Sequence, residues 1–146
     1  GGKTLVSTMK ANGAYTALVS GGFTAFSVPV GEILGFDEQH ANKLHEENGI
    51  FTGQVIDPIL GKNEKVNRLK SLVKDRGLSQ NDVLAVGDGA NDLGMLEIAG
   101  MGVAMHPKPI VAEKCDIVIN HCDLTSLLYL QGYRKEDFVG AKTDVK

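Results

Sequence analysis

One stretch of the chain, residues 83–96, constrains the fold more than any other. It opens with the apolar run Val83–Val86, a pattern typical of a buried parallel strand. The run breaks at Gly87-Asp88-Gly89, and helix-period apolar residues resume with Leu93 and Leu96. A strand that feeds an acidic, glycine-flanked loop and then a helix places carboxylates at the carboxyl end of a sheet. Ligands bind at that edge in open α/β sheets, so a ligand site is predicted there.

The side chains of this loop indicate a magnesium site. Asp88 and Asp92 offer hard oxygen ligands within one tight loop, which suits Mg²⁺. Gly87 and Gly89 permit backbone angles and close approaches that a Cβ atom would prevent. A simpler interpretation is a solvated turn with a helix N-cap at Asn91 or Asp92, but a cap requires only one such residue.

Composition excludes several classes of function. The chain has 146 residues, a net charge of −3 and no apolar run of membrane-spanning length. We therefore expect neither a nucleic-acid partner nor a membrane. Cys115 and Cys122 are too few for a disulfide framework and favour a reducing, cytoplasmic location. With His106 and His121 they lack the pair spacing of a zinc site.

A second strand–loop–helix unit is predicted near the N-terminus. The β-favouring run 15–19 precedes Ser20-Gly21-Gly22, and a helical pattern follows over residues 23–34, with Pro29 expected to kink or interrupt it. Backbone N–H groups at such a helix start form an anion site, and the Ser20 hydroxyl adds a donor. The triplet alone also fits an ordinary strand-to-helix turn.

Strands and helices alternate along the rest of the chain, which predicts a parallel α/β sheet with right-handed crossovers. Lys65 falls in the first turns of one helix, a position where lysine is normally solvated. The polar segment from Gln131 onward is expected to fray. The remaining predicted elements are helices over 3–12, 62–76 and 123–130, a hairpin of runs 40–45 and 50–56 around Asn48-Gly49, a short helix within 107–114, and strands over 101–105 and 116–119.

Three separated pieces carry a resemblance to a known family. Residues 18–23 (Leu-Val-Ser-Gly-Gly-Phe), Lys65 and residues 87–92 (Gly-Asp-Gly-Ala-Asn-Asp) resemble motifs two, three and four of the haloacid dehalogenase superfamily. Residues 41–44 and 48–53 are similar to the hairpin segment of its phosphoserine phosphatases. The resemblance implies a three-layer, Rossmann-like parallel sheet with a β-hairpin.

The resemblance also implies how a phosphate is held. Ser20, the Gly21 amide and Gly22 would bind the transferring phosphoryl oxygens, and Asn91 would contact the phosphate. Lys65 would neutralise its charge and hold the carboxylate of the nucleophile. Metal, cationic and amide donors around the equatorial oxygens are what phosphoryl transfer requires.

For the metal and the reaction, the resemblance implies a Mg²⁺-dependent phosphomonoester hydrolase. Asp88 would bind Mg²⁺ directly, and Asp92 would support the metal site from behind without ligating the ion. Lys65 and Asp88 would be the catalytic residues of this chain. The family's reaction passes through an aspartyl-phosphate, and the implied substrate is O-phospho-L-serine, in the last step of serine biosynthesis.

One motif of the family is absent. No Asp-x-Asp occurs in the sequence, although that first motif supplies the nucleophile. We therefore expect the chain to begin downstream of this motif and of the helical cap. Residues 1–133 would form the C-terminal part of a catalytic core, with residues 134–146 as a polar tail. The missing strand would lie between strands 15–19 and 83–86, supplied by an N-terminal segment or a second chain, and the 146 residues alone would be inactive.

Three alternatives follow from the same residues. The chain is either part of a phosphatase or phosphotransferase for another small phosphomonoester, or an inactive truncated module that binds phosphate or a partner. A P-type ATPase domain has a similar acidic loop, but its second motif reads Thr-Gly-Asp where this chain has Ser-Gly-Gly, and it requires membrane spans.

Overall fold

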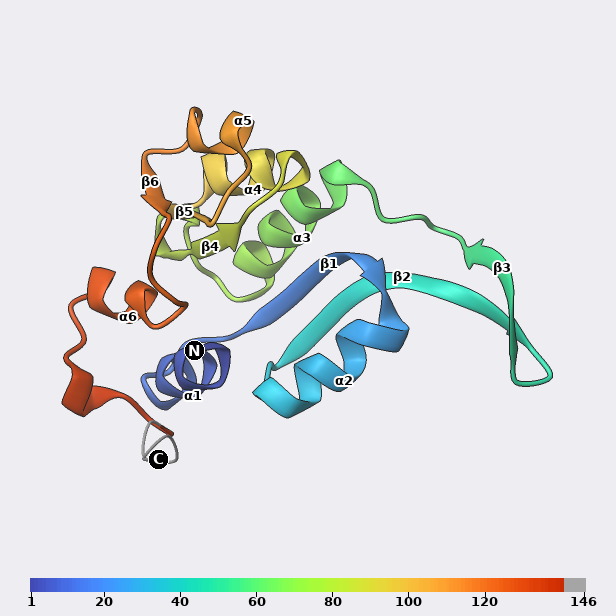
Figure 1. The fold of residues 1–146 in the computed structure, drawn as a ribbon, viewed down its shortest axis with the longest axis horizontal. Coiled ribbons are helices and arrows are strands. Elements are labelled where there is room, and N and C mark those ends of the chain that lie inside the picture. The colour runs from blue at the N-terminus through green and yellow to red at the C-terminus, as the bar shows by residue number, and fades with distance from the viewer. Residues whose placement is uncertain (141–146) are drawn as a thin grey trace. The chain divides into compact units, whose positions relative to one another are not determined.

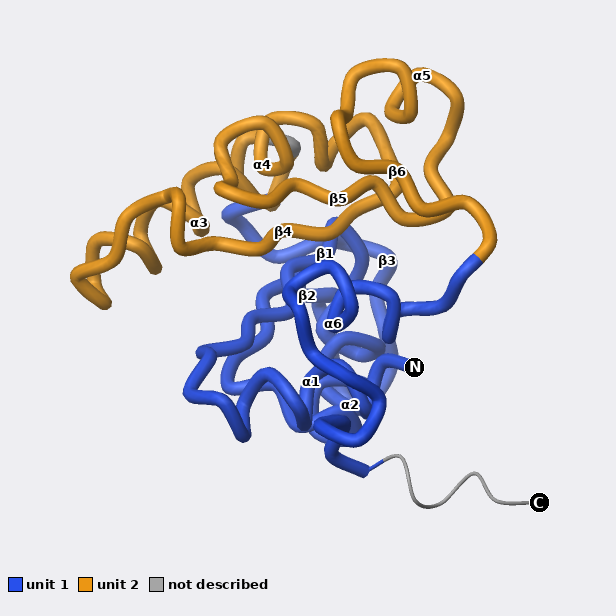
Figure 2. Tube along the Cα trace, turned by 90° about the vertical axis from the view of Figure 1, so that its left-hand side faces the viewer, with its two compact units in different colours: residues 1–59, 122–146 blue, residues 60–121 orange. Residues whose placement is uncertain are grey.

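The computed structural model describes residues 1–140, and of Lys62 the backbone alone. The chain divides into two compact units (Figure 2). Unit 1 comprises residues 1–59 and the segment from Cys122 onward, and unit 2 comprises residues 60–121. Each unit is described by itself below.

Unit 1 is built on a three-stranded sheet of order β1-β2-β3 (Figure 1). β1 and β2 are parallel, and β2 and β3 form an antiparallel hairpin. The described helices and strands of this unit are α1 (Gly2–Ala11), β1 (Ala17–Phe23), α2 (Thr24–Leu34), β2 (Glu38–Glu47), β3 (Ile50–Ile56) and α6 (Ser126–Leu130).

The hairpin turn confirms the prediction made from Asn48-Gly49. Both residues have positive φ angles, 52° and 79°, and the flanking residues Glu47 and Ile50 are paired. A two-residue turn with both central residues left-handed matches the twist of its strands, which is why Asn-Gly favours it. β3 has the predicted bounds, and β2 is longer than the predicted run 40–45 because backbone pairing continues through its polar ends.

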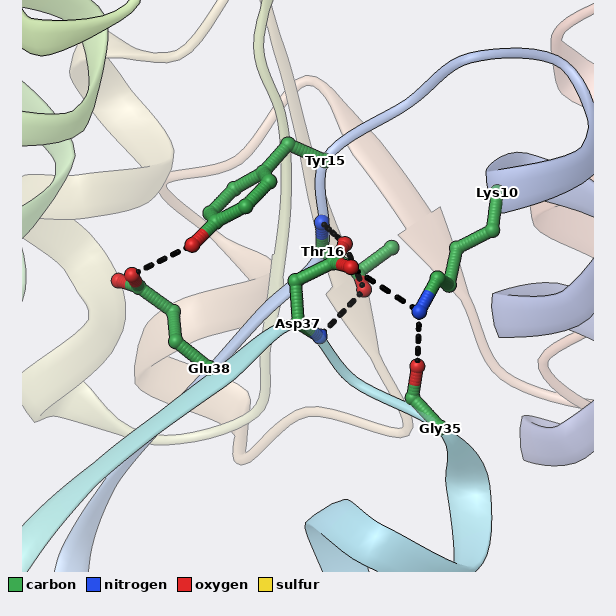
Figure 3. Close-up of polar contacts among 6 residues, drawn as sticks. All are labelled: Lys10, Tyr15, Thr16, Gly35, Asp37 and Glu38. Carbon is green, nitrogen blue, oxygen red and sulfur yellow. Dashed lines mark hydrogen bonds and ion pairs between the residues drawn. The ribbon is translucent and has the colours of Figure 1, made fainter.

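The amino ends of β1 and β2 are joined by a polar network (Figure 3). The backbone N–H and the hydroxyl of Thr16 both donate to the Asp37 carboxylate, at 2.8 and 2.9 Å. Lys10 of α1 forms an ion pair with that carboxylate at 3.0 Å and donates to the Gly35 carbonyl at 2.8 Å. Beside them the Tyr15 hydroxyl donates to Glu38. The network ties α1 and the end of α2 to the start of both parallel strands.

The C-terminal part of unit 1 is ordered as far as it is described. The rings of Tyr129 and Phe138 lie 5.1 Å apart, and the Val139 N–H donates to the buried hydroxyl of Thr8 at 2.9 Å. The prediction that the segment from Gln131 frays is therefore wrong for residues 131–140. Residues 141–146 lie outside the described part of the chain.

Unit 2 contains a parallel sheet of order β4-β5-β6. Its core gathers apolar side chains from the sheet and from the helices packed on it. The described elements of unit 2 are α3 (Lys62–Asp75), β4 (Leu84–Gly87), α4 (Leu93–Ile98), β5 (Met101–Met105), α5 (Pro109–Ala112) and β6 (Ile117–Ile119), and the buried core residues are Leu69, Ala85, Leu96, Ala104 and Val111.

The expected α/β class, with parallel strands and one hairpin, is confirmed. Three local features differ from the predictions. β1 continues through Ser20-Gly21-Gly22 instead of ending at Val19, and α2 is not interrupted at Pro29, where a kink or an interruption was expected. The last predicted helix begins at Ser126 rather than Asp123, because the Asp123 carboxylate accepts the Thr125 N–H in a turn of its own. Among the described helices, none combines the length and apolar character needed to cross a membrane.

Candidate functional site

The acidic loop of unit 2 is organised around the buried side chain of Asp92. One carboxylate oxygen of Asp92 accepts the backbone N–H groups of Asp88 and Gly89, at 3.0 and 3.1 Å. The other oxygen accepts a hydrogen bond from the ammonium group of Lys65. Asp92 therefore links the turn after β4 to a cation on α3, and both of its oxygens are occupied by protein donors.

Lys65 reaches Asp92 because α3 and α4 pack closely. Gly94, in the first turn of α4, lies so near Val66 of α3 that a Cβ atom on Gly94 would approach the Val66 side chain to 2.8 Å. Lys65 precedes Val66 in α3, and only 12% of its side chain is exposed. The expectation of a solvated surface lysine is therefore wrong.

The ion pair shifts the titration of Asp92. Burial by itself would raise the pKa of the Asp92 carboxyl, because it penalises the charged form. The hydrogen bond from Lys65, the charge of Lys65 and the hydrogen bonds from the Gly89 and Asp88 amides outweigh burial and hold the pKa below its ordinary range. Asp92 is consequently a carboxylate at neutral pH.

The two glycines of the loop are required by its tight geometry. A Cβ atom on Gly87 would lie 2.5 Å from the Asp92 side chain, and one on Gly89 would lie 2.7 Å from the Asn91 side-chain oxygen. The close approach expected at these positions from the sequence is confirmed.

Asp88 and Asn91 are exposed at the carboxyl end of β4. The carbonyl of Asp88 accepts the N–H of Lys108 at 3.1 Å, which ties the loop to the segment after β5. An exposed carboxylate at this edge fits one oxygen ligand of Mg²⁺, an ion that usually takes only one or two carboxylates and completes its shell with water and phosphate. Within residues 1–140 no group of three or more acidic, His or Cys side chains is placed to hold a metal.

In unit 1, Ser20-Gly21-Gly22 forms an irregular stretch near the carboxyl end of β1. Ser20 is half-buried, and Gly21 and Gly22 are exposed. The Ser20 hydroxyl oxygen accepts the Gly22 N–H at 3.0 Å. The Gly21 carbonyl accepts from the side-chain amide of Asn42, a buried residue of β2, also at 3.0 Å.

The predicted site residues thus fall into two groups. Unit 2 brings Lys65 and Asp92 together beside the backbone of Asp88 and holds Asn91 in the same loop. Ser20, Gly21 and Gly22 lie in unit 1. Asn42, which donates to the Gly21 carbonyl, was not among the site residues predicted from the sequence. Asparagine is depleted in strands, so its place inside an extended run was the available signal.

Comparison with known proteins identifies the family. The family model described as haloacid dehalogenase-like hydrolase matches residues 1–97. A phosphoserine phosphatase of Streptomyces coelicolor is 38% identical over 143 residues, which cover 98% of this chain and 35% of that protein. The phosphoserine phosphatase of Methanocaldococcus jannaschii is 39% identical over 128 residues, covering 88% of this chain and 61% of that protein.

Solved structures agree with these sequence matches. An unliganded probable phosphoserine phosphatase from Vibrio cholerae superposes with a TM-score of 0.84 at 37% identity, covering 88% of this chain and 40% of that one. A phospho-aspartyl intermediate analogue of phosphoserine phosphatase superposes with a TM-score of 0.81 at 38% identity, covering 88% and 61% of the two chains.

The α/β fold is shared with these solved structures, and the chain belongs to the haloacid dehalogenase-like hydrolase family. It spans about a third to three-fifths of the length of the relatives described above.

Proposed function

We propose that this chain is part of a Mg²⁺-dependent phosphomonoester hydrolase. The observation that carries the proposal is the position of Asp92, which joins the Lys65 cation to the loop that bears Asp88. Lys65 and the backbone of Asp88 are thus bonded to the same carboxylate, just after the carboxyl end of a strand in a parallel sheet, and the Asp88 residue is exposed there. A cation such as Lys65 neutralises the charge of a phosphate, and a carboxylate such as Asp88 binds the metal ion that accompanies it.

In this proposal Lys65 offsets the negative charge of the transferring phosphoryl group, as a compact point charge. Ser20, the Gly21 amide and Asn91 are each proposed to contact a phosphoryl oxygen, and Gly22 is proposed to act through Ser20. The Gly22 N–H already donates to Ser20, so the contribution of Gly22 is to orient the Ser20 hydroxyl. The hydroxyl proton is then available to a phosphate oxygen.

Asp88 is the residue that would hold Mg²⁺. Its carboxylate is exposed, whereas both oxygens of Asp92 are engaged by protein donors, so Asp92 would support the site without ligating the ion. Bound Mg²⁺ supplies charge stabilisation for the phosphoryl oxygens. The remaining ligands would come from the substrate, water and residues outside this chain.

The nucleophile is proposed to lie outside these 146 residues. The sequence contains no Asp-x-Asp, and the chain covers only part of its relatives' length. In the proposed reaction an aspartate carboxylate attacks phosphorus, the substrate alkoxide leaves, and water then cleaves the aspartyl-phosphate. β1 and β4 are edge strands of the sheets in the described part of the chain, so each has an unpaired edge there. An additional strand, from an N-terminal segment or a second chain, could pair with such an edge.

We infer that O-phospho-L-serine is the substrate, that L-serine is the product, and that the enzyme serves serine biosynthesis in the cytoplasm. The inference is supported by the names of the relatives and by the hairpin resemblance of residues 41–44 and 48–53. A bound substrate described for a phosphoserine phosphatase at 38% identity supports the same class of small phosphate ester.

The test is phosphate release by the whole protein that contains these residues, with and without Mg²⁺, beside residues 1–146 alone. We expect Mg²⁺-dependent release by the whole protein and none by the isolated chain, because the covalent route needs the missing aspartate. Absence of release from every phosphomonoester by the folded whole protein would overturn the proposal. Turnover by the isolated chain would place the nucleophile within it.

A further inference from the structure

The strand that carries Ser20 contains a local irregularity. Val19 pairs with His40 and Phe23 pairs with Asn42, so three residues of β1 lie opposite the single residue Ala41 of β2. Extra residues in one strand interrupt the regular ladder and leave backbone groups without their usual partners. In β1, two side chains provide hydrogen-bond partners for some of these backbone groups.

Both ends of one peptide group are held by these side chains. The carbonyl of Gly21 and the N–H of Gly22 belong to the same planar peptide unit. The Asn42 side-chain amide donates to that carbonyl at 3.0 Å, and the N–H donates to the Ser20 hydroxyl oxygen at 3.0 Å. Asn42 and Ser20 thus form hydrogen bonds to the two opposite ends of the same peptide unit.

We propose that Asn42 is a positioning residue that fixes the Gly21–Gly22 peptide and, through it, the direction of the Ser20 hydroxyl. This inference rests on the proposed function, because it assigns Ser20 a phosphoryl oxygen. The peptide lies between two glycines, which have the widest choice of backbone angles, so it needs an external anchor to keep one orientation. Asn42 is a suitable anchor because it is only 6% exposed and sits within β2.

The orientation of Ser20 then follows. With one lone pair of its oxygen engaged by the Gly22 N–H, the Ser20 hydroxyl has its proton left to donate. If the peptide turned, that N–H would leave the oxygen and the hydroxyl would rotate freely. A donor that is aimed before the reaction stabilises developing charge without reorganisation, so its loss reduces turnover.

The test uses Asn42→Asp in the whole protein, a substitution that keeps the side-chain shape and removes the donor. We expect kcat to fall by about 10–100-fold, the size of effect produced by misplacing a reacting group by about 1 Å, and KM to change much less. The matched control is Asn12→Asp. Asn12 also donates its side-chain amide to a backbone carbonyl, that of Thr8 at 2.8 Å, but at the end of α1. We expect this control to leave kcat unchanged.

A double-mutant cycle separates positioning from a general structural role. If Asn42 acts through the Ser20 hydroxyl, Asn42→Asp will cost little further activity in a Ser20→Ala background. If the activity loss in the double variant equals the product of the losses in the two single variants, the proposal is overturned. If the wild type hydrolyses phosphomonoesters and folded Asn42→Asp has the same kcat, this inference alone is overturned. If the wild type is inactive on all phosphomonoesters, the proposed function is overturned as well.

A measurement on the wild-type protein covers the case in which Asn42→Asp does not fold. In NMR spectra, saturating inorganic phosphate should shift the Asn42 side-chain amide together with the Gly22 backbone amide. A shift at Gly22 without one at Asn42 would contradict the proposed link.

Discussion

The ammonium group of Lys65 lies against the carboxylate of Asp92 in the interior of unit 2. The two side chains are only 12% and 5% exposed. A pair so well removed from water behaves differently from a surface ion pair, because removing one partner leaves the other charged, buried and unpaired. Asp92 also holds the Asp88 and Gly89 amides, so the pair couples a buried charge to the shape of the loop.

Asp92→Asn should therefore destabilise the protein strongly. The substitution keeps the shape of the side chain but removes the charge opposite Lys65, and we expect a loss of roughly 3–5 kcal/mol in the free energy of unfolding. Glu136→Gln is the control, because Glu136 pairs with Arg134 at 3.8 Å on the surface and should contribute less than about 1 kcal/mol. Equal and small effects in urea unfolding of both variants would contradict the buried-pair account.

The stabilising contribution of Asp92 should depend on pH in a definite direction. Its pKa in the folded protein lies below the ordinary value of about 3.9 for an unfolded chain. A lowered pKa means that the contribution is fully present above the unfolded value and is lost as pH falls toward the folded one. The difference in unfolding free energy between wild type and Asp92→Asn should thus shrink below about pH 3.9. A difference that stays constant from neutral to acid pH would contradict this.

Lys65 should be required for turnover as well as for stability. Lys65→Met keeps most of the side-chain volume, and we expect the whole protein carrying it to lose turnover by about 100-fold or more, as for other groups that stabilise transition-state charge. Lys70, exposed on the same helix, is the control, and Lys70→Met should change stability by less than about 0.5 kcal/mol and leave kcat unchanged. Wild-type turnover in folded Lys65→Met would remove Lys65 from the proposed site.

The parts of the fold that local sequence determines were predictable. Asn48-Gly49 specifies a tight hairpin because both residues tolerate positive φ angles. The apolar run before Asp88 specifies a parallel strand, and the glycines beside it specify close approach. These features depend on residues that are neighbours in the chain.

The remaining features depend on contacts between distant residues. Ser20-Gly21-Gly22 has the composition of a loop, yet Asn42 on the next strand keeps it within β1. Lys65 has the position of a surface lysine, yet Gly94 lets α3 approach α4 closely enough to bury it. Such outcomes follow from packing, which local propensity does not encode.

Asp88→Asn should weaken the dependence of activity on Mg²⁺. An amide oxygen is a poorer ligand for this hard cation than a carboxylate, so in the whole protein the Mg²⁺ concentration for half-maximal activity should rise and kcat should fall severely. Asp75→Asn, at the exposed end of α3, serves as the control for general charge effects. An unchanged Mg²⁺ titration and rate in Asp88→Asn would exclude Asp88 from metal binding.

The central claim is most directly tested by the substrate preference of the whole protein. The measurement is kcat/KM for O-phospho-L-serine against a larger sugar phosphate, both with saturating Mg²⁺, because specificity is a ratio of these values. We predict a preference for O-phospho-L-serine of about 100-fold or more, within the range that a site built to bind polar substrate groups achieves. A clear preference for the sugar phosphate would contradict the phosphoserine assignment, while membership of the hydrolase family would stand.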